Sequence, residues 1–207
     1  MISVIICTYE QPLSLVWLLE SLAAQTCTEP LEILIADDGS PEPAAVSLAA
    51  VSGARFVRGE TNAGFVRSCN AAAAQARGSV LVFLNNDTIV EPGFLDPLVE
   101  NFDHDSRVGA AGAMLTYPNG TIQEAGGIIW STAAGWNYGR GDHIDDCRYQ
   151  WRREVDYCSG AALMVRRSIW NSLGGFDALY LPGGVEDADL GYRAWKEGYK
   201  GYYEPKS

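Results

Sequence analysis

The sequence contains no apolar run that approaches the roughly 18 residues needed to span a membrane. Its first apolar stretch, residues 2–7, is too short for the core of a signal peptide and has no basic flank. Basic residues are scarce as well, since 15 Lys and Arg stand against 26 Asp and Glu, for a formal net charge of −11. This charge argues against non-specific binding to nucleic acid or an anionic membrane. It does not exclude a phosphorylated ligand held by a metal ion or a helix N-terminus.

Several motifs that define metal and nucleotide sites in other protein classes are missing. The two histidines, His104 and His143, have no metal-ligand spacing to each other. Gly139-Arg140-Gly141 lacks the third glycine of a dinucleotide-binding loop, and there is no Gly-Lys-Ser/Thr phosphate loop. An odd number of cysteines without Cys-x-x-Cys spacing predicts reduced, mostly buried thiols in a cytosolic protein: Cys7, Cys27, Cys69, Cys147 and Cys158.

The first hundred residues do contain a regular alternation of strand and helix patterns. We expect strands over 2–7, 31–36, 54–58 and 79–84, and helices over 12–25, 43–51, 62–76 and 92–104. Such alternation predicts an α/β fold with a mostly parallel central sheet and helices on both faces. The length of 207 residues and the hydrophobic content of 47% fit one domain with a full core.

The second half has a weaker pattern. We expect strands over 108–116 and 155–165, the latter broken at Ser159-Gly160, and a helix over 186–198. Residues 117–153 are rich in Gly, Asn, Tyr and Trp and show no clear period. Long irregular segments of this kind are usually functional or mobile.

Polar side chains follow three of the expected strands at the point where each strand ends. They are Thr8-Tyr9-Glu10, Asp37-Asp38 and Asn85-Asn86-Asp87. Because ligands of such sheets bind beyond the carboxyl ends of the strands, we expect the three clusters to gather along one edge. Polar groups left unpaired beside a buried strand cost free energy. A capping role would satisfy the polar groups of one cluster. Capping alone does not require three converging clusters.

Asp87 is the candidate metal ligand. A carboxylate just past a strand end is a hard oxygen ligand suited to Mg²⁺ or Mn²⁺, which retain water and phosphate ligands. Taken alone, Asp87 would more often cap a turn. The run Asp37-Asp38-Gly39-Ser40 is either a plain turn or a nucleoside site, in which a carboxylate accepts hydrogen bonds from a base or a ribose. We assign nucleoside recognition to Asp38.

Further charged residues lie near expected helix starts. Arg67 lies about one turn into the helix that follows Asn62-Ala63-Gly64, where it could contact a phosphate or a base. A solvated arginine is the alternative. The run Glu186-Asp187-Ala188-Asp189 has more acids than the helix dipole needs, so one of them could act as a general base. Asp189 stands four residues before Arg193, which predicts a salt bridge between them.

The order of these motifs resembles the family 2 glycosyltransferases, inverting enzymes of the GT-A fold that use nucleotide-sugar donors. The resemblance covers nearly the whole chain, through the segments Ser3–Tyr9, Ala36–Ser40, Asn62–Asn70, Leu84–Thr88, Cys158–Arg167, Gly174–Asp177 and Glu186–Leu190. It implies a general base at Asp187, with Glu186 as the fallback, and a Mg²⁺ or Mn²⁺ ion at Asp87. It also implies a donor site formed by Thr8, Tyr9, Glu10, Asp38, Asn62, Gly64, Arg67, Asn85 and Asn86.

The resemblance implies transfer of a sugar from a UDP- or dTDP-sugar to an acceptor hydroxyl with inversion, in the synthesis of cell-surface polysaccharide or glycoconjugate. The acceptor would be a saccharide, a lipid-linked glycan or another glycan. The reaction would take place in the cytoplasm or at the inner face of the membrane. We expect one GT-A domain over 1–207, with a donor half over 1–104 and an acceptor half over 105–207. Aromatic residues of the second half either stack on sugar rings or pack in the core: Trp130, Trp136, Tyr138 and Trp151.

Two features depart from the family pattern. The first position of the expected Asp-x-Asp metal motif is Asn85, which leaves Asp87 as the one strong metal ligand. The chain also stops at Ser207, before a histidine that in the family often helps to hold the metal. We therefore expect a C-terminally truncated domain of a longer polypeptide.

Two other functions stay open at this point. A sugar-nucleotide pyrophosphorylase would share the sheet and the metal, but it needs a Gly-rich loop with a basic residue, which residues 6–10 lack. A catalytically inactive sugar- or nucleotide-binding module is the second alternative. The presence of Asp38, Asp87 and Asp187 argues against it.

Overall fold

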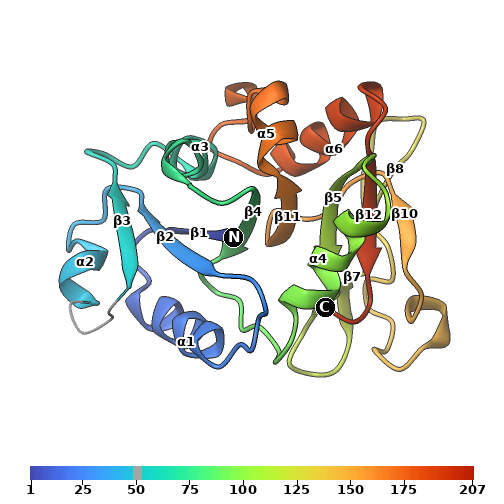
Figure 1. Ribbon diagram of the computed structural model, residues 1–207, viewed down its shortest axis with the longest axis horizontal. Helices are drawn as coiled ribbons and strands as arrows, with labels where there is room; N and C mark the ends of the chain where they lie inside the picture. Colours follow the sequence, from blue (N-terminus) through green and yellow to red (C-terminus); the bar gives the residue numbers. More distant parts are fainter. Residues whose placement is uncertain (49–52) are drawn as a thin grey trace.

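The computed structural model of the chain, which describes residues 1–48 and 53–207, is built around one eight-stranded sheet (Figure 1). The strand order is β10-β12-β5-β11-β4-β1-β2-β3. The bounds are β1 (Ile2–Thr8), β2 (Leu31–Asp37), β3 (Ala54–Arg58), β4 (Val80–Asn85), β5 (Val108–Ala113), β10 (Arg153–Val155), β11 (Ala162–Arg166) and β12 (Lys200–Glu204).

The sheet is mostly parallel. Strands β3, β2, β1 and β4 pair in parallel, as do β5 and β12. Strand β11 runs antiparallel between β4 and β5, and β10 runs antiparallel at the edge beside β12. The predicted fold class, an α/β domain with a mostly parallel central sheet, is confirmed. The reversed direction of β11 matters for the site, because the residues before it lie beside the end of β4.

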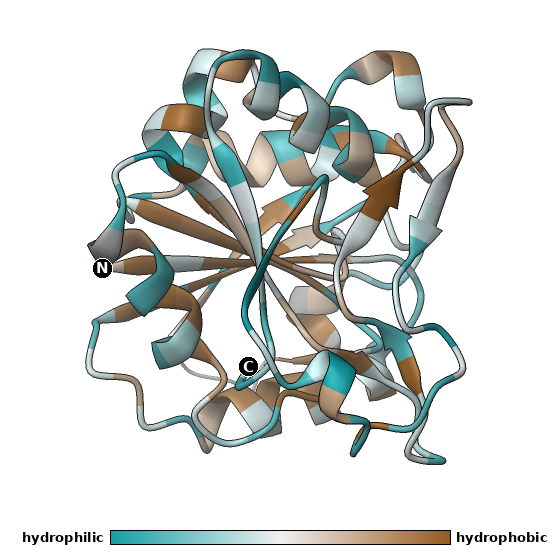
Figure 2. Cartoon of the chain, turned by 90° about the vertical axis from the view of Figure 1, so that its right-hand side faces the viewer, coloured by the Kyte–Doolittle hydropathy of each residue, from teal (hydrophilic) through white to brown (hydrophobic). Residues whose placement is uncertain are grey.

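Helices cover both faces of the sheet. In Figure 2 the hydrophobic strands lie between helices above and below them. One face packs against α1 (Pro12–Ala23), α2 (Ala44–Ser47) and α4 (Leu95–His104), and the other against α3 (Phe65–Gln75), α5 (Arg167–Leu173) and α6 (Glu186–Lys196). Among the described residues, no helix is both long enough and apolar enough to cross a bilayer.

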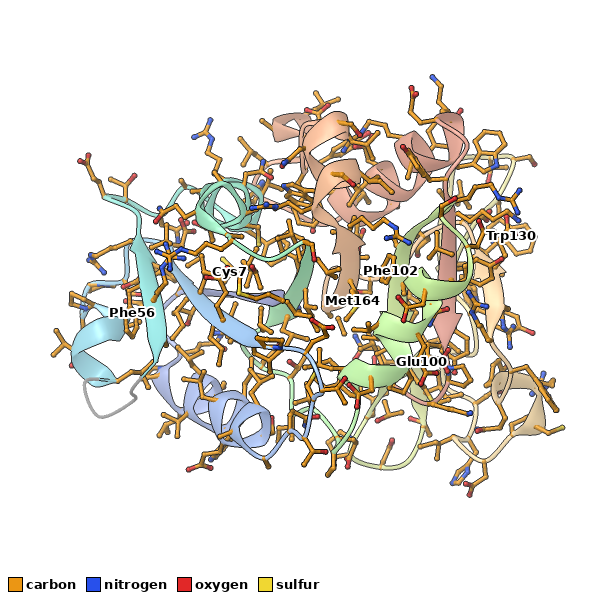
Figure 3. The ribbon with its side chains drawn as sticks, in the orientation of Figure 1. Cys7, Phe56, Glu100, Phe102, Trp130 and Met164 are labelled. Atoms are coloured by element: carbon orange, nitrogen blue, oxygen red, sulfur yellow. The ribbon has the colours of Figure 1, made fainter. Side chains whose placement is uncertain are left out.

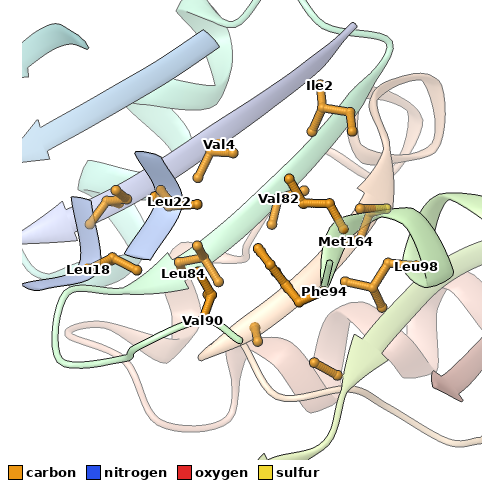
Figure 4. Close-up of a cluster of buried hydrophobic side chains, with 14 of the residues drawn as sticks. Ile2, Val4, Leu18, Leu22, Val82, Leu84, Val90, Phe94, Leu98 and Met164 are labelled. Carbon is orange, nitrogen blue, oxygen red and sulfur yellow. The ribbon is translucent and has the colours of Figure 1, made fainter. Parts of the chain in front are cut away.

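The core on the α1 and α4 side explains why these segments fold together. Leu18 and Leu22 of α1 and Leu98 of α4 belong to one buried cluster with Val82 and Leu84 of β4 (Figure 4). All five side chains are buried. Full burial of one such side chain contributes about 1.5 to 3 kcal/mol to stability. The helical spacing of the leucines and the apolar run of β4 therefore fix these elements against each other.

The element boundaries differ from the sequence prediction in a few places. The strand expected over 108–116 divides into β5 and a short β6 (Leu115–Thr116), and α5 was not predicted. The helix expected over 43–51 is seen as α2, and residues 49–52 lie outside the described part of the chain. The helix expected over 62–76 begins at Phe65, because Gly64 has a φ of 89°, outside the helical range.

The segment without a clear sequence period is folded. It contains β7 (Ile122–Glu124), β8 (Gly127–Ile129), β9 (Gly135–Asn137) and the 3₁₀ helix η1 (Cys147–Tyr149). Outside this segment, a second 3₁₀ helix, η2 (Ala178–Tyr180), precedes α6. Strands β8 and β9 pair in an antiparallel hairpin. Ile122 and Tyr149 pack with Tyr203 of β12 in a small core of their own. The segment is thus anchored to the last strand of the sheet.

The cysteines are all free thiols, as predicted. Cys69 and Cys158 are buried, and burial is the main reason that the pKa of each thiol is raised well above its ordinary value. Cys147 is exposed, which differs from the expected buried position, because it starts the surface helix η1.

Candidate functional site

The three polar clusters lie along one edge of the sheet, as predicted. The parallel register places Thr8 beside Asp37, and Cys7 beside Asn85. The Nδ2 atom of Asn86 donates a hydrogen bond to Oγ1 of Thr8 at 3.1 Å, which links the turns after β1 and β4. The carboxyl ends of β1, β2 and β4 therefore present their polar residues together.

The turn after β4 exposes Asp87. Oγ1 of Thr88 donates to the carbonyl oxygen of Asn85 at 2.7 Å, and the Thr88 N–H donates to the same oxygen at 3.2 Å, which closes the turn. Asp87 is exposed and takes part in no hydrogen bond or ion pair that the described residues form. Its carboxylate is therefore free to bind a ligand and does not cap the turn.

Asp87 suits a metal ion that keeps most of its ligands from elsewhere. Within residues 1–48 and 53–207, no group of three or more His, Cys, Asp and Glu side chains could hold a metal. One exposed carboxylate beside two amides fits Mg²⁺ or Mn²⁺, because these ions are commonly bound through one or two carboxylates plus substrate phosphates and water. The donor set therefore fits a metal that arrives with a diphosphate.

Asp38 is engaged in holding the chain together. Its carboxylate accepts hydrogen bonds from the N–H groups of Ala63 and Gly64 at 2.8 and 2.9 Å and from Oγ of Ser68 at 2.7 Å. The side chain is only 3% exposed. The two N–H groups lie just before α3, which begins at Phe65, and Ser68 lies in its first turn. Asp38 ties the turn after β2 to the residues that lead into α3, and its contact with a nucleoside stays a prediction.

Asp37 is also buried and paired. Its carboxylate accepts hydrogen bonds from the N–H groups of Ser40 and Ala44, each at 2.9 Å, and forms an ion pair with Arg58 at 2.5 Å. Burial pushes the pKa of Asp37 upward, but these hydrogen bonds outweigh it and hold the pKa below the ordinary value. Asp37 therefore stabilises the turn after β2 as an anion.

A cavity of about 400 Å³ opens beside the turn after β1. Thr8, Glu10 and Ser40 supply its polar lining, and Leu15 and Leu48 supply part of its apolar lining. The Glu10 N–H donates to Oγ of Ser40 at 3.1 Å, which joins the turns after β1 and β2. A planar ring with polar atoms at its edge fits this cavity, because the cavity has both polar and apolar walls.

The remaining predicted donor residues lie at or near the start of α3 and after β1. Gly64 is buried, and a Cβ at this position would lie 2.9 Å from Cβ of Pro182, so only glycine fits. Asn62 and Tyr9 are exposed. Arg67 is exposed on α3 and forms no hydrogen bond or ion pair with the residues that the structure describes. Arg67 is therefore free to reach an anionic ligand.

The turn before β11 joins the two halves of the site. The Ser159 N–H donates to Oε1 of Glu124 at 2.9 Å, and the next N–H, that of Gly160, donates to Oδ2 of Asp187 at 2.9 Å. The carbonyl oxygen of Ala161 accepts a hydrogen bond from the Asn85 N–H at 3.1 Å. Three consecutive residues thus connect the Asp87 turn with two carboxylates from distant segments.

The structure distinguishes the two acids at the start of α6. Asp187 lines a cleft of about 1020 Å³, whereas Glu186 is 6% exposed, does not line the cleft, and accepts a hydrogen bond from the Gly184 N–H. Burial raises the pKa of Asp187, and the charge of Glu186 adds to this, although hydrogen bonds from Gly160 and Ala188 oppose it. Asp187 is the acid that can meet a ligand in the cleft.

Glu124, which sequence reasoning missed, lines the same cleft. It is 2% exposed, and its pKa is raised to about 7, mainly by burial and further by the charge of Asp187, against the hydrogen bond from Ser159. The strand alternation held a weak signal, because Glu124 is two residues after the buried Ile122 and so points to the same side of β7.

We expect the raised pKa of Glu124 to make stability fall as pH rises. A carboxyl whose folded pKa is about 7, against an ordinary value of 4.5, stabilises the fold below the lower value. That stabilisation is lost as pH rises through the higher value. Between pH 5 and pH 8 the loss should be about 2 to 3 kcal/mol. Urea denaturation should show this slope in the wild type and its reduction in Glu124→Gln.

Glu154→Gln is a matched control for that measurement. Glu154 lines the same cleft, but it is exposed and forms an ion pair with Lys200 at 2.5 Å. This substitution should leave the pH slope as in the wild type. Equal slopes in the wild type and Glu124→Gln would show that Glu124 does not ionise in this range.

Aromatic side chains line part of the cleft. Trp130, Tyr180, Tyr192 and Trp195 take part in the lining, and the rings of Tyr192 and Trp195 stack with centroids 5.8 Å apart. Trp130 projects at the side of the molecule near β8 (Figure 3). Four aromatic residues were candidates either for stacking on sugar rings or for the core, and of these Trp130 alone lies in this lining, whereas three do not: Trp136, Tyr138 and Trp151.

Solved structures share this architecture. The structure of GalNAc-T7 with UDP, GalNAc and Mn²⁺ superposes with a TM-score of 0.81 at 18% identity, over 99% of this chain and 42% of that one. The mannosyltransferase PcManGT from Pyrobaculum calidifontis, in complex with GDP-Man and Mn²⁺, gives a TM-score of 0.69 at 18% identity. That match covers 97% of this chain and 53% of the other. The fold is that of the GT-A glycosyltransferases.

Sequence comparison identifies the family within this class. The model of "Glycosyl transferase family 2" matches residues 3–174. The chain belongs to this family and is a glycosyltransferase domain. The O-antigen biosynthesis protein RfbC of Myxococcus xanthus is 33% identical over 96% of this chain, which spans 16% of that protein. The N-acetylglucosaminyl-diphospho-decaprenol L-rhamnosyltransferase of Mycobacterium tuberculosis is 26% identical over 99% of this chain and 73% of its own length.

Proposed function

We propose that the chain transfers a sugar from a UDP- or dTDP-sugar to an acceptor hydroxyl, with inversion at the anomeric carbon. The observation that carries this proposal is the turn before β11, which connects the Asp87 turn with Asp187 through Asn85, Gly160 and Ala161. A free carboxylate for a metal diphosphate and a carboxylate for proton removal are thereby held on neighbouring segments. Inversion needs these two functions on opposite sides of the sugar.

The donor occupies the sheet edge in this proposal. The nucleoside lies in the cavity lined by Thr8 and Glu10, with Tyr9 and the Asp38 turn beside it, and residues 1–104 form the donor half. The diphosphate lies at Asn85-Asn86-Asp87 with Mg²⁺ or Mn²⁺ bound at Asp87. Arg67 and Asn62, at or near the start of α3, face its negative charge.

The reaction follows from the placement of Asp187 in the cleft. The acceptor oxygen forms a bond to the anomeric carbon while the bond from that carbon to the diphosphate oxygen breaks. The electron pair of the broken bond leaves with the nucleoside diphosphate, and the carboxylate of Asp187 accepts the hydroxyl proton. A bound divalent cation supplies Lewis-acid stabilisation of the leaving diphosphate.

The acceptor lies in the cleft of residues 105–207. Tyr192 and Trp195 offer a stacked pair of rings, and Trp195 is 63% exposed, as a platform for the apolar face of a sugar would be. We propose a saccharide or lipid-linked glycan acceptor, in cell-surface polysaccharide synthesis at the cytoplasmic side of the membrane. The names of the Myxococcus and Mycobacterium relatives support this class of acceptor.

Asp87→Ala should abolish the increase in UDP affinity that Mn²⁺ causes in the wild type. The reason is that Asp87 is the exposed carboxylate of the turn, so its loss removes the protein ligand that joins metal and diphosphate. Calorimetric titration of UDP with and without Mn²⁺ measures this difference. Asp103→Ala, which removes an exposed aspartate of α4, is the control and should keep the Mn²⁺ effect. An unchanged Mn²⁺ effect in Asp87→Ala would place the metal elsewhere.

A further inference from the structure

Glu124 and Asp187 both accept hydrogen bonds from one turn of backbone. The donors of their hydrogen bonds, the N–H groups of Ser159 and Gly160, belong to consecutive residues, and both bonds are 2.9 Å long. Glu124 comes from β7 and Asp187 from α6, so segments far apart in the sequence meet here. Both carboxylates also line the same cleft.

We propose that Glu124 and Asp187 form an electrostatically coupled carboxylate pair, in which Glu124 acts through Asp187 and sets its basicity. This inference rests on the proposed role of Asp187 as the general base. It adds a second acid to that role, from a segment that has no part in the donor site. Glu124 is a positioning residue here, because it acts through Asp187.

The surroundings of the pair favour its keeping one proton. Among the described residues, neither carboxylate forms an ion pair with Lys, Arg or His. Other titratable groups next to the pair are acidic or neutral: Asp156, Tyr157, Cys158 and Glu186. Lys200, which also lines the cleft, is paired with Glu154. Two neighbouring carboxylates without a cation resist the loss of the second proton.

The shifts of the carboxyl groups agree with this arrangement. Burial and then the charge of Asp187 raise the pKa of Glu124 to about 7, and the pKa of Asp187 is raised as well, mainly by burial and then by the charge of Glu186. Tyr157 stays neutral, since burial and the two carboxylates raise its pKa to about 12. Near neutral pH the pair therefore gains or loses a proton. When Glu124 is ionised, its negative charge raises the pKa of Asp187 and makes Asp187 a stronger base.

The pair can be tested without a sugar substrate. Carbon-13 NMR of protein labelled at the side-chain carboxyls of Asp and Glu, titrated between about pH 4 and pH 9, follows each group directly. In Asp187→Asn, the apparent pKa of Glu124 should fall from about 7 by about one unit, and stay raised because burial remains. In Glu124→Gln, the pKa of Asp187 should fall by a similar amount, and Glu154→Gln should change neither titration.

The inference is overturned if the Glu124 titration is the same in the wild type and in Asp187→Asn, and the Asp187 titration is the same in Glu124→Gln. Reading the coupling from both sides covers the case in which one variant fails to fold. The transfer assay separates this result from the proposed function. If Asp187→Asn lost turnover but the two titrations were not coupled, the pair would be rejected and Asp187 would remain the general base. If the titrations were coupled but Asp187→Asn kept full turnover, the pair would stand and the role of Asp187 as base would be rejected.

The pH dependence of transfer gives a second readout. In Glu124→Gln, the acid limb of kcat/KM should move to lower pH by about one unit, since Asp187 loses its neighbouring charge. UDP affinity with Mn²⁺ should stay as in the wild type, because Glu124 lies in the cleft and not at the sheet edge. An acid limb that does not move would contradict the tuning role.

Discussion

Asp187→Asn is expected to lower kcat by about 10²- to 10⁴-fold, the usual contribution of a general base. Donor affinity should stay nearly intact, because the proton moves only while the acceptor attacks. Asp187 lines the cleft and accepts hydrogen bonds from the N–H groups of Gly160 and Ala188. An asparagine can keep one of these contacts but cannot take up a proton. Release of the nucleoside diphosphate at saturating donor measures kcat, and calorimetry with UDP and Mn²⁺ measures the donor site.

Two variants of the same helix serve as comparisons. Asp189→Asn replaces an acid that lines the same cleft but is held by Arg193 in an ion pair of 2.6 Å, which the spacing had predicted. Because this carboxylate already has a cationic partner, kcat should fall by less than in Asp187→Asn. Glu186→Gln tests the fallback base, which is buried outside the cleft. If Glu186→Gln removed turnover while Asp187→Asn kept it, the base would be one residue earlier. If neither mattered, the acids would serve the helix dipole alone.

Asp38→Ala should cost about 3 to 5 kcal/mol of unfolding free energy, the second large effect that we expect, because a buried donor left without its acceptor costs about 1 to 3 kcal/mol. The variant leaves the N–H groups of Ala63 and Gly64 and the hydroxyl of Ser68 without their shared acceptor, in a buried position. The start of α3 should then loosen, and with it the segment that carries Arg67. Urea denaturation measures the loss. Calorimetry with uridine and UDP should show both ligands weakened alike.

Asp177→Ala provides a matched control in an exposed place. Asp177 accepts a hydrogen bond from the Leu179 N–H at 2.8 Å at the start of η2, and both residues are exposed. Its loss should cost about 1 kcal/mol or less, because water can replace the missing acceptor. If Asp38→Ala kept wild-type stability yet lost uridine binding, the carboxylate of Asp38 would serve the ligand and not the helix.

Local patterns in the sequence predicted the frame of this domain. The alternation of strand and helix periods gave the parallel strands β1 to β4, and parallel strands place their carboxyl ends at one edge. The meeting of Thr8, Asp37 and Asn85 at that edge follows from the register alone. These features were predictable because they depend on hydrophobic spacing and turn residues, which are read within a window of a few residues.

What each acid does was decided by contacts between distant segments. The sequence by itself determined the fold class, the edge that holds the polar turns and the family. The tertiary structure decided that Asp38 binds the N–H groups of Ala63 and Gly64, and that Asp187 and not Glu186 lines the cleft. It also decided that Glu124 and Asp187 bind to one backbone turn. The physical reason is that periodicity records which face of a segment is buried. Whether a buried carboxylate meets a backbone N–H or another carboxylate depends on chain folding that brings residues 124, 159 and 187 together.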